Sequence, residues 1–214
     1  MNIQYLITFL IRLIAYVLLL PPVGYFRAWV AKKMGDTLAE ERGYLTLNPF
    51  VHVPIIGVVL LFIFGLGVIN LTPINPASSA YNPPWRRLKL AIVAFSGVLA
   101  YVLLAVIAVA GLAIFIAKSG TLIYEPFNLS LVGILASFAQ LATFFAILEF
   151  FMYSVFLMLL PLVEDYIIEP IHLYYGMILI AIILIFFFGE SLETLLTHGI
   201  SSAAEFLVHI ISGT

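Results

Sequence analysis

Residues 90–117 read LAIVAFSGVLAYVLLAVIAVAGLAIFIA and contain no charged side chain. At about 1.5 Å per residue, a helix of this length exceeds the roughly 30 Å of hydrocarbon in a bilayer. The whole chain has the same character, because 64% of its 214 residues are hydrophobic and 9% are charged. A soluble domain carries about 25% charged residues. The composition therefore predicts a membrane protein with several transmembrane helices.

Three further apolar segments are long enough to cross a bilayer. They are residues 3–20, 129–148 and 170–189. The first contains Arg12, which must pair or extend towards water because an isolated charge in lipid is costly. No cleavage signal follows this segment, so we expect a retained anchor rather than a signal peptide. Glu149 follows the second segment, and the apolar sequence continues to residue 163, which predicts a long tilted helix that unwinds near Pro161.

The C-terminal residues 190–214 have a different pattern. Leucine and isoleucine recur there near helical spacing, and Glu190, Glu193 and Glu205 lie between them. This pattern predicts an amphipathic helix at the membrane interface or against a partner. We therefore expect a membrane domain over residues 1–189 and a C-terminal amphipathic helix over residues 190–214.

Basic residues flank the apolar residues 53–71 on both sides. Seven of the nine basic residues of the chain lie there: Arg27, Lys32, Lys33 and Arg42 before the segment, and Arg86, Arg87 and Lys89 after it. The positive-inside rule places both groups in the cytoplasm, whereas a simple crossing would separate them. We favour a re-entrant hairpin over a crossing. The predicted fold is an all-α polytopic membrane protein with about four transmembrane helices, this hairpin and the C-terminal amphipathic helix.

Charge and cysteine content exclude several functions. The net charge is −2, so we expect no nucleic-acid partner. The chain has no cysteine, which excludes disulfides, cysteine catalysis and thiolate metal sites. A metal would need His, Asp or Glu as ligands.

Three stretches of sequence resemble one family. They are RAWVAKKMGD (residues 27–36), GYLTLNPFVHVPIIG (residues 43–57), and PINP (residues 73–76) with the later AFSG (residues 94–97). LLPL at residues 159–162 is a weaker fourth element. These stretches resemble the site-2 protease family of intramembrane zinc metallopeptidases, especially its small bacterial branch. The residues that match the family scaffold are Thr46, Asn48, Pro49, His52, Gly57, Asn75, Pro76 and Gly97.

The zinc-binding residues of that family do not match. The resemblance implies an HExxH helix, in which two histidines at i and i+4 hold zinc and the glutamate activates a water molecule. Here Val23 and Arg27 stand at the histidine positions and Gly24 at the glutamate. A guanidinium stays protonated and cannot bind a cation. The third ligand would fall near Tyr166 or Asp165. We therefore expect no metal, no cofactor and no catalytic residue.

The remaining polar residues leave alternatives open. Arg27, Glu149 and Asp165 are candidates for a polar network, because a charge in an apolar segment needs a partner. Glu149 could instead mark a helix break. For His52 we favour a structural hydrogen bond in a loop, and for Asn48 a cap of the same turn. Asp165 belongs to an acidic group that could hold a cation, pair with arginine or form a solvated edge.

These observations favour a catalytically inactive relative of the site-2 proteases that acts as a binding or accessory subunit of a membrane complex. We expect it in a bacterial inner membrane, with the lipid bilayer and membrane proteins as its partners. One alternative is an active zinc peptidase with displaced ligands, drawn from His52, Glu149, Asp165 and His172. Another is a transporter or channel subunit, although no internal repeat supports it.

Overall fold

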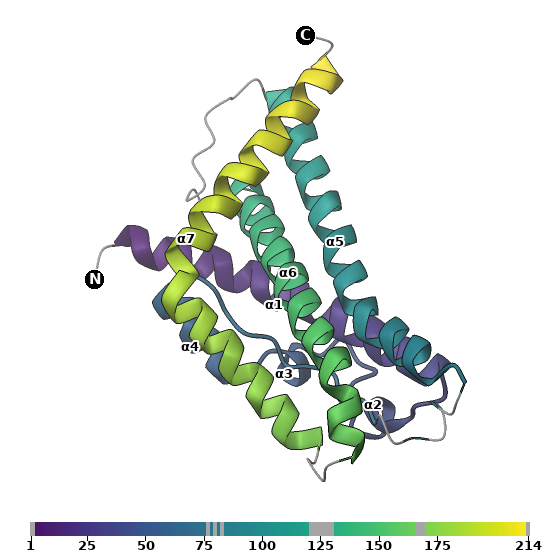
Figure 1. Ribbon diagram of the computed structural model, residues 1–214. Helices are drawn as coiled ribbons and strands as arrows, with labels where there is room; N and C mark the ends of the chain where they lie inside the picture. Colours follow the sequence, from purple (N-terminus) through teal and green to yellow (C-terminus); the bar gives the residue numbers. More distant parts are fainter. Residues whose placement is uncertain are drawn as a thin grey trace.

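The computed structural model describes residues 3–75, 78, 81, 84–119, 131–165 and 170–212 (Figure 1). Its side chains are described within these ranges except at residues 119, 159–165, 170–175, 177 and 178. The described part of the chain is helical and contains no strand. Its helices are α1 (Ile3–Lys33), α2 (Leu38–Glu41), α3 (Pro49–His52), α4 (Ile55–Phe64), α5 (Arg86–Ser119), α6 (Leu131–Asp165) and α7 (Pro170–Ser212).

Four of these helices are long and apolar enough to cross a membrane. The qualifying segments are Ile3–Lys33, Arg86–Lys118, Leu131–Met158 and Leu179–Ser212. The predicted all-α fold with about four transmembrane helices is confirmed, and the chain is an integral membrane protein.

Helices α5, α6 and α7 form a bundle that α1 crosses at a steep angle (Figure 1). At one end of the bundle the three helices meet through small side chains: Ala108 of α5, Ala136 and Ala139 of α6, and Ala204 of α7 are all buried. Small residues allow helix backbones to approach closely. The van der Waals contacts that this approach creates help to hold helices together in lipid.

The short helix α4 is the first arm of a hairpin. It ends at Gly65, whose φ of 72° is the left-handed conformation that glycine adopts without strain. The chain then returns along α4, so that a Cβ on Gly57 would lie 2.6 Å from the carbonyl oxygen of Val68. Tyr16 of α1 donates a hydrogen bond to that same carbonyl. Protein therefore covers the non-helical arm, as such backbone requires inside a membrane.

Asp36 ties the two ends of this hairpin segment together. Its carboxylate accepts hydrogen bonds from the backbone N–H of Leu38 (3.1 Å) and of Asn75 (2.8 Å), and from the Tyr81 hydroxyl (3.0 Å). The chain therefore enters and leaves the hairpin at the same end of α1. This course agrees with the re-entrant hairpin that the charge pattern predicts, and it brings both basic groups to one end of the molecule.

The prolines inside α1 and α6 do not end these helices. Helix α6 continues past Pro161 to Asp165, so the predicted unwinding at that proline is wrong. Likewise, α1 runs through Pro21 and Pro22. A proline removes one backbone hydrogen bond, and transmembrane helices tolerate this loss because neighbouring groups compensate for it.

The C-terminal residues do not form a helix of their own. Helix α7 runs unbroken from Pro170 to Ser212, so the predicted amphipathic tail is the second half of a transmembrane helix. Gly189 lies inside this helix and is not one of the described glycines with a positive φ. No helix break marks the predicted domain boundary between residues 189 and 190. That boundary stays a prediction.

We predict that both basic groups lie in the cytoplasm. Single cysteines at Glu41 and Arg87, two exposed positions in a chain without native cysteine, should react with a membrane-impermeant thiol reagent from the same side. A cysteine at Gln4, at the other end of α1, should react from the opposite side. Labelling of the Glu41 and Arg87 positions from opposite sides would show that residues 53–71 cross the bilayer.

Candidate functional site

A buried ion pair joins α1 to α6. The Nη2 atom of Arg27 donates a hydrogen bond to Oε2 of Glu149, and the two residues are 2% and 0% exposed. Residues of such opposite charge are rarely buried unless they are paired. The structure thus brings together two of the three residues that the sequence offered as a polar network.

Glycine in α5 makes room for this pair. A Cβ on Gly97 would overlap the Arg27 guanidinium and would lie 2.6 Å from Glu149 Oε2. Gly97 is therefore required by the close approach of the guanidinium to the α5 backbone. The matching scaffold position in the sequence thus has a steric explanation in this chain.

Two tyrosines complete the surroundings of the pair. The Arg27 guanidinium carbon lies 5.2 Å from the ring centroid of Tyr153, which is a cation–π contact. Tyr101 of α5 is 2% exposed and close enough to interact electrostatically with both charges. Tyr153 follows Glu149 by one helical turn, and this spacing is the sequence signal that could have identified it.

The pair retains unused hydrogen-bonding capacity. Arg27 Nε and Glu149 Oε1 are buried, and neither has a hydrogen-bond partner among the described residues. A buried polar atom without a partner costs about 1–3 kcal/mol, and more when it belongs to a charged group. The site is therefore polar at its centre although apolar side chains enclose it.

Val23, Gly24 and Arg27, which stand at the HExxH positions of the resemblance described above, face this same interior. Val23 and Gly24 are buried one turn before Arg27. His52 of α3 packs directly against Gly24: a Cβ at that position would lie 2.6 Å from His52 Cε1 and closer still to Nδ1. A glutamate at position 24 would collide with this ring. The imidazole thus occupies the space beside the window.

A short loop holds His52 in place. The His52 Nε2 atom lies 2.8 Å from the carbonyl oxygen of Thr46, so Nε2 carries the proton and donates it. Nδ1 is then an acceptor, and it has no partner among the described residues. Asn48 caps α3 by accepting a hydrogen bond from the Phe50 N–H (3.1 Å), with Pro49 at the first helical position. The expected structural roles of His52 and Asn48 match these contacts.

Other scaffold residues act in the hairpin. Gly57 allows Tyr16 and the returning backbone to approach α4, and Asn75 donates its N–H to Asp36. Pro76 lies outside the described residues. Asp36, the last residue of the RAWVAKKMGD stretch, was not among the predicted site residues, although it is only 1% exposed and accepts three hydrogen bonds.

Asp165 is the third residue of the predicted polar network. It is the last residue of α6, sixteen residues after Glu149, and this spacing corresponds to about 24 Å along a helix. Its side chain lies outside the described residues, as do Tyr166 and the side chain of His172. The membership of Asp165 in the network therefore stays a prediction.

The donor set around α1 does not fit zinc. Zinc sites need about three or four deprotonated His, Cys, Asp or Glu ligands around one point. The described part of the chain contains no group of three such residues that could hold a metal ion. At the window itself the side chains are a valine, a glycine and an arginine, and the arginine carries a positive charge that repels a cation.

A comparison with curated proteins finds one short similarity. Over 48 residues the chain is 42% identical to a protein of Bacillus subtilis (strain 168) named "Putative zinc metalloprotease YwhC". The match covers 22% of this chain and 22% of that protein. No family model matches the chain, and no solved structure matches it significantly. A segment of this integral membrane protein is thus similar to a protein named as a zinc metalloprotease.

We predict that losing one charge of the Arg27–Glu149 pair destabilises the fold more than losing both charges. Arg27→Met or Glu149→Leu alone should lower the free energy of unfolding in detergent micelles by about 3–5 kcal/mol, because each leaves a buried charge unpaired. The double variant should lie close to the wild type, because it removes both charges at once. Equal losses that add in the double variant would show that the two side chains do not interact.

We also predict a pH dependence that arises from His52. Burial lowers the pKa of this imidazole below its ordinary value of 6.5, and its hydrogen bond to Thr46 only partly opposes this effect. The unfolded chain then binds the proton more readily, so stability is present above pH 6.5 and is lost as the pH falls below it. Thermal unfolding between pH 7.5 and 5 should show a drop in Tm that His52→Gln removes. An unchanged drop in that variant would assign it to other groups.

Proposed function

We propose that this chain is a catalytically inactive relative of the site-2 proteases, and that it acts as a binding or accessory subunit of a protein complex in a bacterial inner membrane. The observation that carries the proposal is the Arg27–Glu149 ion pair. It fills the interior that the HExxH window of α1 faces, and it does so with a cation where that family holds a metal.

The 48-residue similarity to the bacterial protein named as a putative zinc metalloprotease supports the relationship. The loss of function is inferred from chemistry. Arginine cannot serve as a general base or a zinc ligand at pH 7, because its guanidinium stays protonated. Glu149 is held by that guanidinium and is therefore not available to activate water.

Binding is the remaining role that this architecture supports. Long helices α5 and α7 leave most of their apolar surface uncovered, since only 28% and 22% of their most apolar windows are buried within the chain. Such faces suit lipid or the helices of another membrane protein. The buried polar core fixes the relative positions of α1, α5 and α6, so these outer faces are presented on a defined scaffold.

One observation favours an active zinc enzyme as a second candidate. His52 Nδ1 is buried beside Gly24 and has no partner among the described residues, so its lone pair is available to a ligand. Zinc analysis of the purified protein distinguishes the two candidates. We expect far less than one zinc per chain. About one zinc per chain, lost in His52→Ala, would support the enzyme and contradict the proposal.

The subunit proposal predicts a defined complex in mild detergent. Native mass spectrometry should find the 23.7 kDa chain together with a second membrane polypeptide in a fixed ratio. Arg27→Ala, which loosens the scaffold, should reduce that second polypeptide per folded chain. Leu104→Ala, at a half-buried apolar position of α5, should leave it in place. A chain that is always monomeric, or a complex that Arg27→Ala does not affect, would contradict the proposal.

A further inference from the structure

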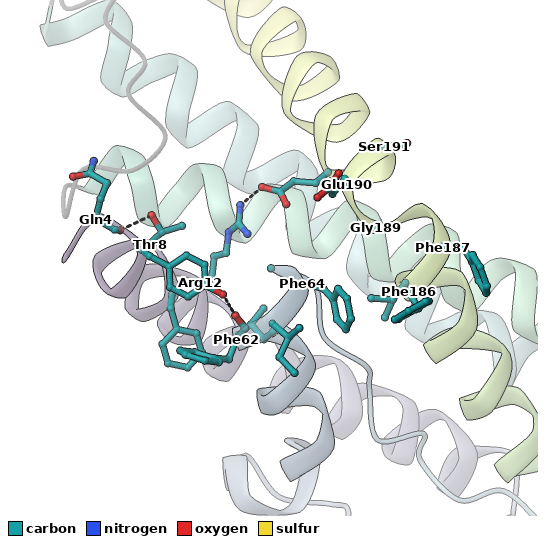
Figure 2. Close-up of a pocket in the computed structure, with 17 residues that line it drawn as sticks. Gln4, Thr8, Arg12, Phe62, Phe64, Phe186, Phe187, Gly189, Glu190 and Ser191 are labelled. Atoms are coloured by element: carbon teal, nitrogen blue, oxygen red, sulfur yellow. Dashed lines mark hydrogen bonds and ion pairs between the residues drawn. The ribbon is translucent and has the colours of Figure 1, made fainter. Parts of the chain in front are cut away.

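A second polar site lies near the N-terminal end of α1. A cavity of about 610 Å³ opens there between α1, the end of α4 and the middle of α7 (Figure 2). It is separate from the Arg27–Glu149 site, because Arg12 in its wall precedes Arg27 by fifteen residues, or about 22 Å along α1.

Polar side chains from two helices converge in this cavity. Gln4, Thr8 and Arg12 recur every four residues and so follow one face of α1, and Figure 2 shows Arg12 pointing towards α7. Arg12 donates a hydrogen bond to Glu193 of α7 and forms an ion pair with it. Glu190 lies one turn earlier on α7. A polar path therefore leads from the buried guanidinium to the first turn of α1.

Aromatic rings form the other wall. Phe62 of α4 packs edge-on against Tyr5 and Phe9 of α1, with ring centroids 5.6 and 5.0 Å apart. Phe64 packs in the same way against Phe186 of α7, at 5.8 Å. The cavity is thus amphipathic, and its aromatic side adjoins faces of α1, α4 and α7 that are exposed to lipid.

The charges in the cavity favour a cation. Arg12 is the one basic residue among the described residues that line it, and Glu193 neutralises Arg12. The Glu190 carboxylate is exposed and forms no ion pair with the described residues. One negative charge therefore remains beside aromatic rings, and such a combination attracts ammonium groups.

We propose that this cavity binds a phospholipid with an amine headgroup. Its ammonium group lies against Glu190, its phosphate takes N–H donors that Arg12 does not use for Glu193, and its acyl chains lie along the aromatic wall. A guanidinium has five such donors. The volume falls within the range of about 300–1,000 Å³ that is usual for small-ligand sites, whereas a partner helix of about 10 Å diameter needs a long groove.

Lipid binding to the purified protein tests this proposal. Native mass spectrometry in detergent would compare phosphatidylethanolamine with phosphatidylglycerol of the same acyl chains. We expect one phosphatidylethanolamine to bind about tenfold more tightly than phosphatidylglycerol, and Glu190→Gln to remove this preference, since a hydrogen bond to a charged group contributes about that factor. Glu205→Gln, an exposed glutamate further along α7, should change neither affinity.

Glu190 is exposed, so its substitution leaves the fold intact and a negative result is interpretable. Equal binding of the two lipids would mean that the cavity holds bilayer lipid without headgroup recognition, and would overturn the proposal. A preference that survives Glu190→Gln would also overturn it, as would a native complex in which a second polypeptide fills the cavity and no lipid is retained. The two lipid comparisons do not depend on zinc content or on the proposed subunit role.

Discussion

The buried contact between Arg27 and Glu149 is the constraint on which the rest of this structure depends. Removing two charges from water costs several kcal/mol for each ion, and only close pairing offsets that cost. The pair therefore fixes α1 against α6 at one point and requires Gly97 on α5, where any side chain would overlap the guanidinium. This contact positions three helices from distant parts of the chain. Apolar side chains alone would not fix these positions, because they contact lipid tails about as favourably as they contact another helix.

Helix α1 carries two such constraints. Arg12 pairs with Glu193 of α7, and Arg27 pairs with Glu149 of α6. At about 100° per residue, fifteen residues place the two arginines about 60° apart around the helix, so each points to a different neighbour. This arrangement explains how α1 crosses the bundle at a steep angle and still satisfies both of its intramembrane charges. It also separates two sites, one enclosed and one open to lipid.

The hairpin of α4 and its returning arm has a related role. Tyr16 and Asn70 satisfy backbone carbonyls of Val68 and Val51, and Asp36 holds the exit of the segment beside its entry. Because Tyr16 lies on α1 and Asp36 lies just after it, α1 and the turn that follows it enclose the irregular backbone. The segment that leads into this hairpin also places the His52 ring against Gly24 of α1.

The sequence by itself determined the membrane class, the four long helices and the hairpin, because each follows from the density of apolar and charged residues along the chain. It also identified Arg27 and Glu149 as charges in need of partners. It could not determine that they pair with each other, because they are 122 residues apart and only the packing of α1 against α6 brings them together. Likewise, Arg12 and Glu193 are 181 residues apart, and only the path of an unbroken α7 brings them together. Local composition sets which segments are helical, whereas the partners of buried charges are set by the packing of whole helices.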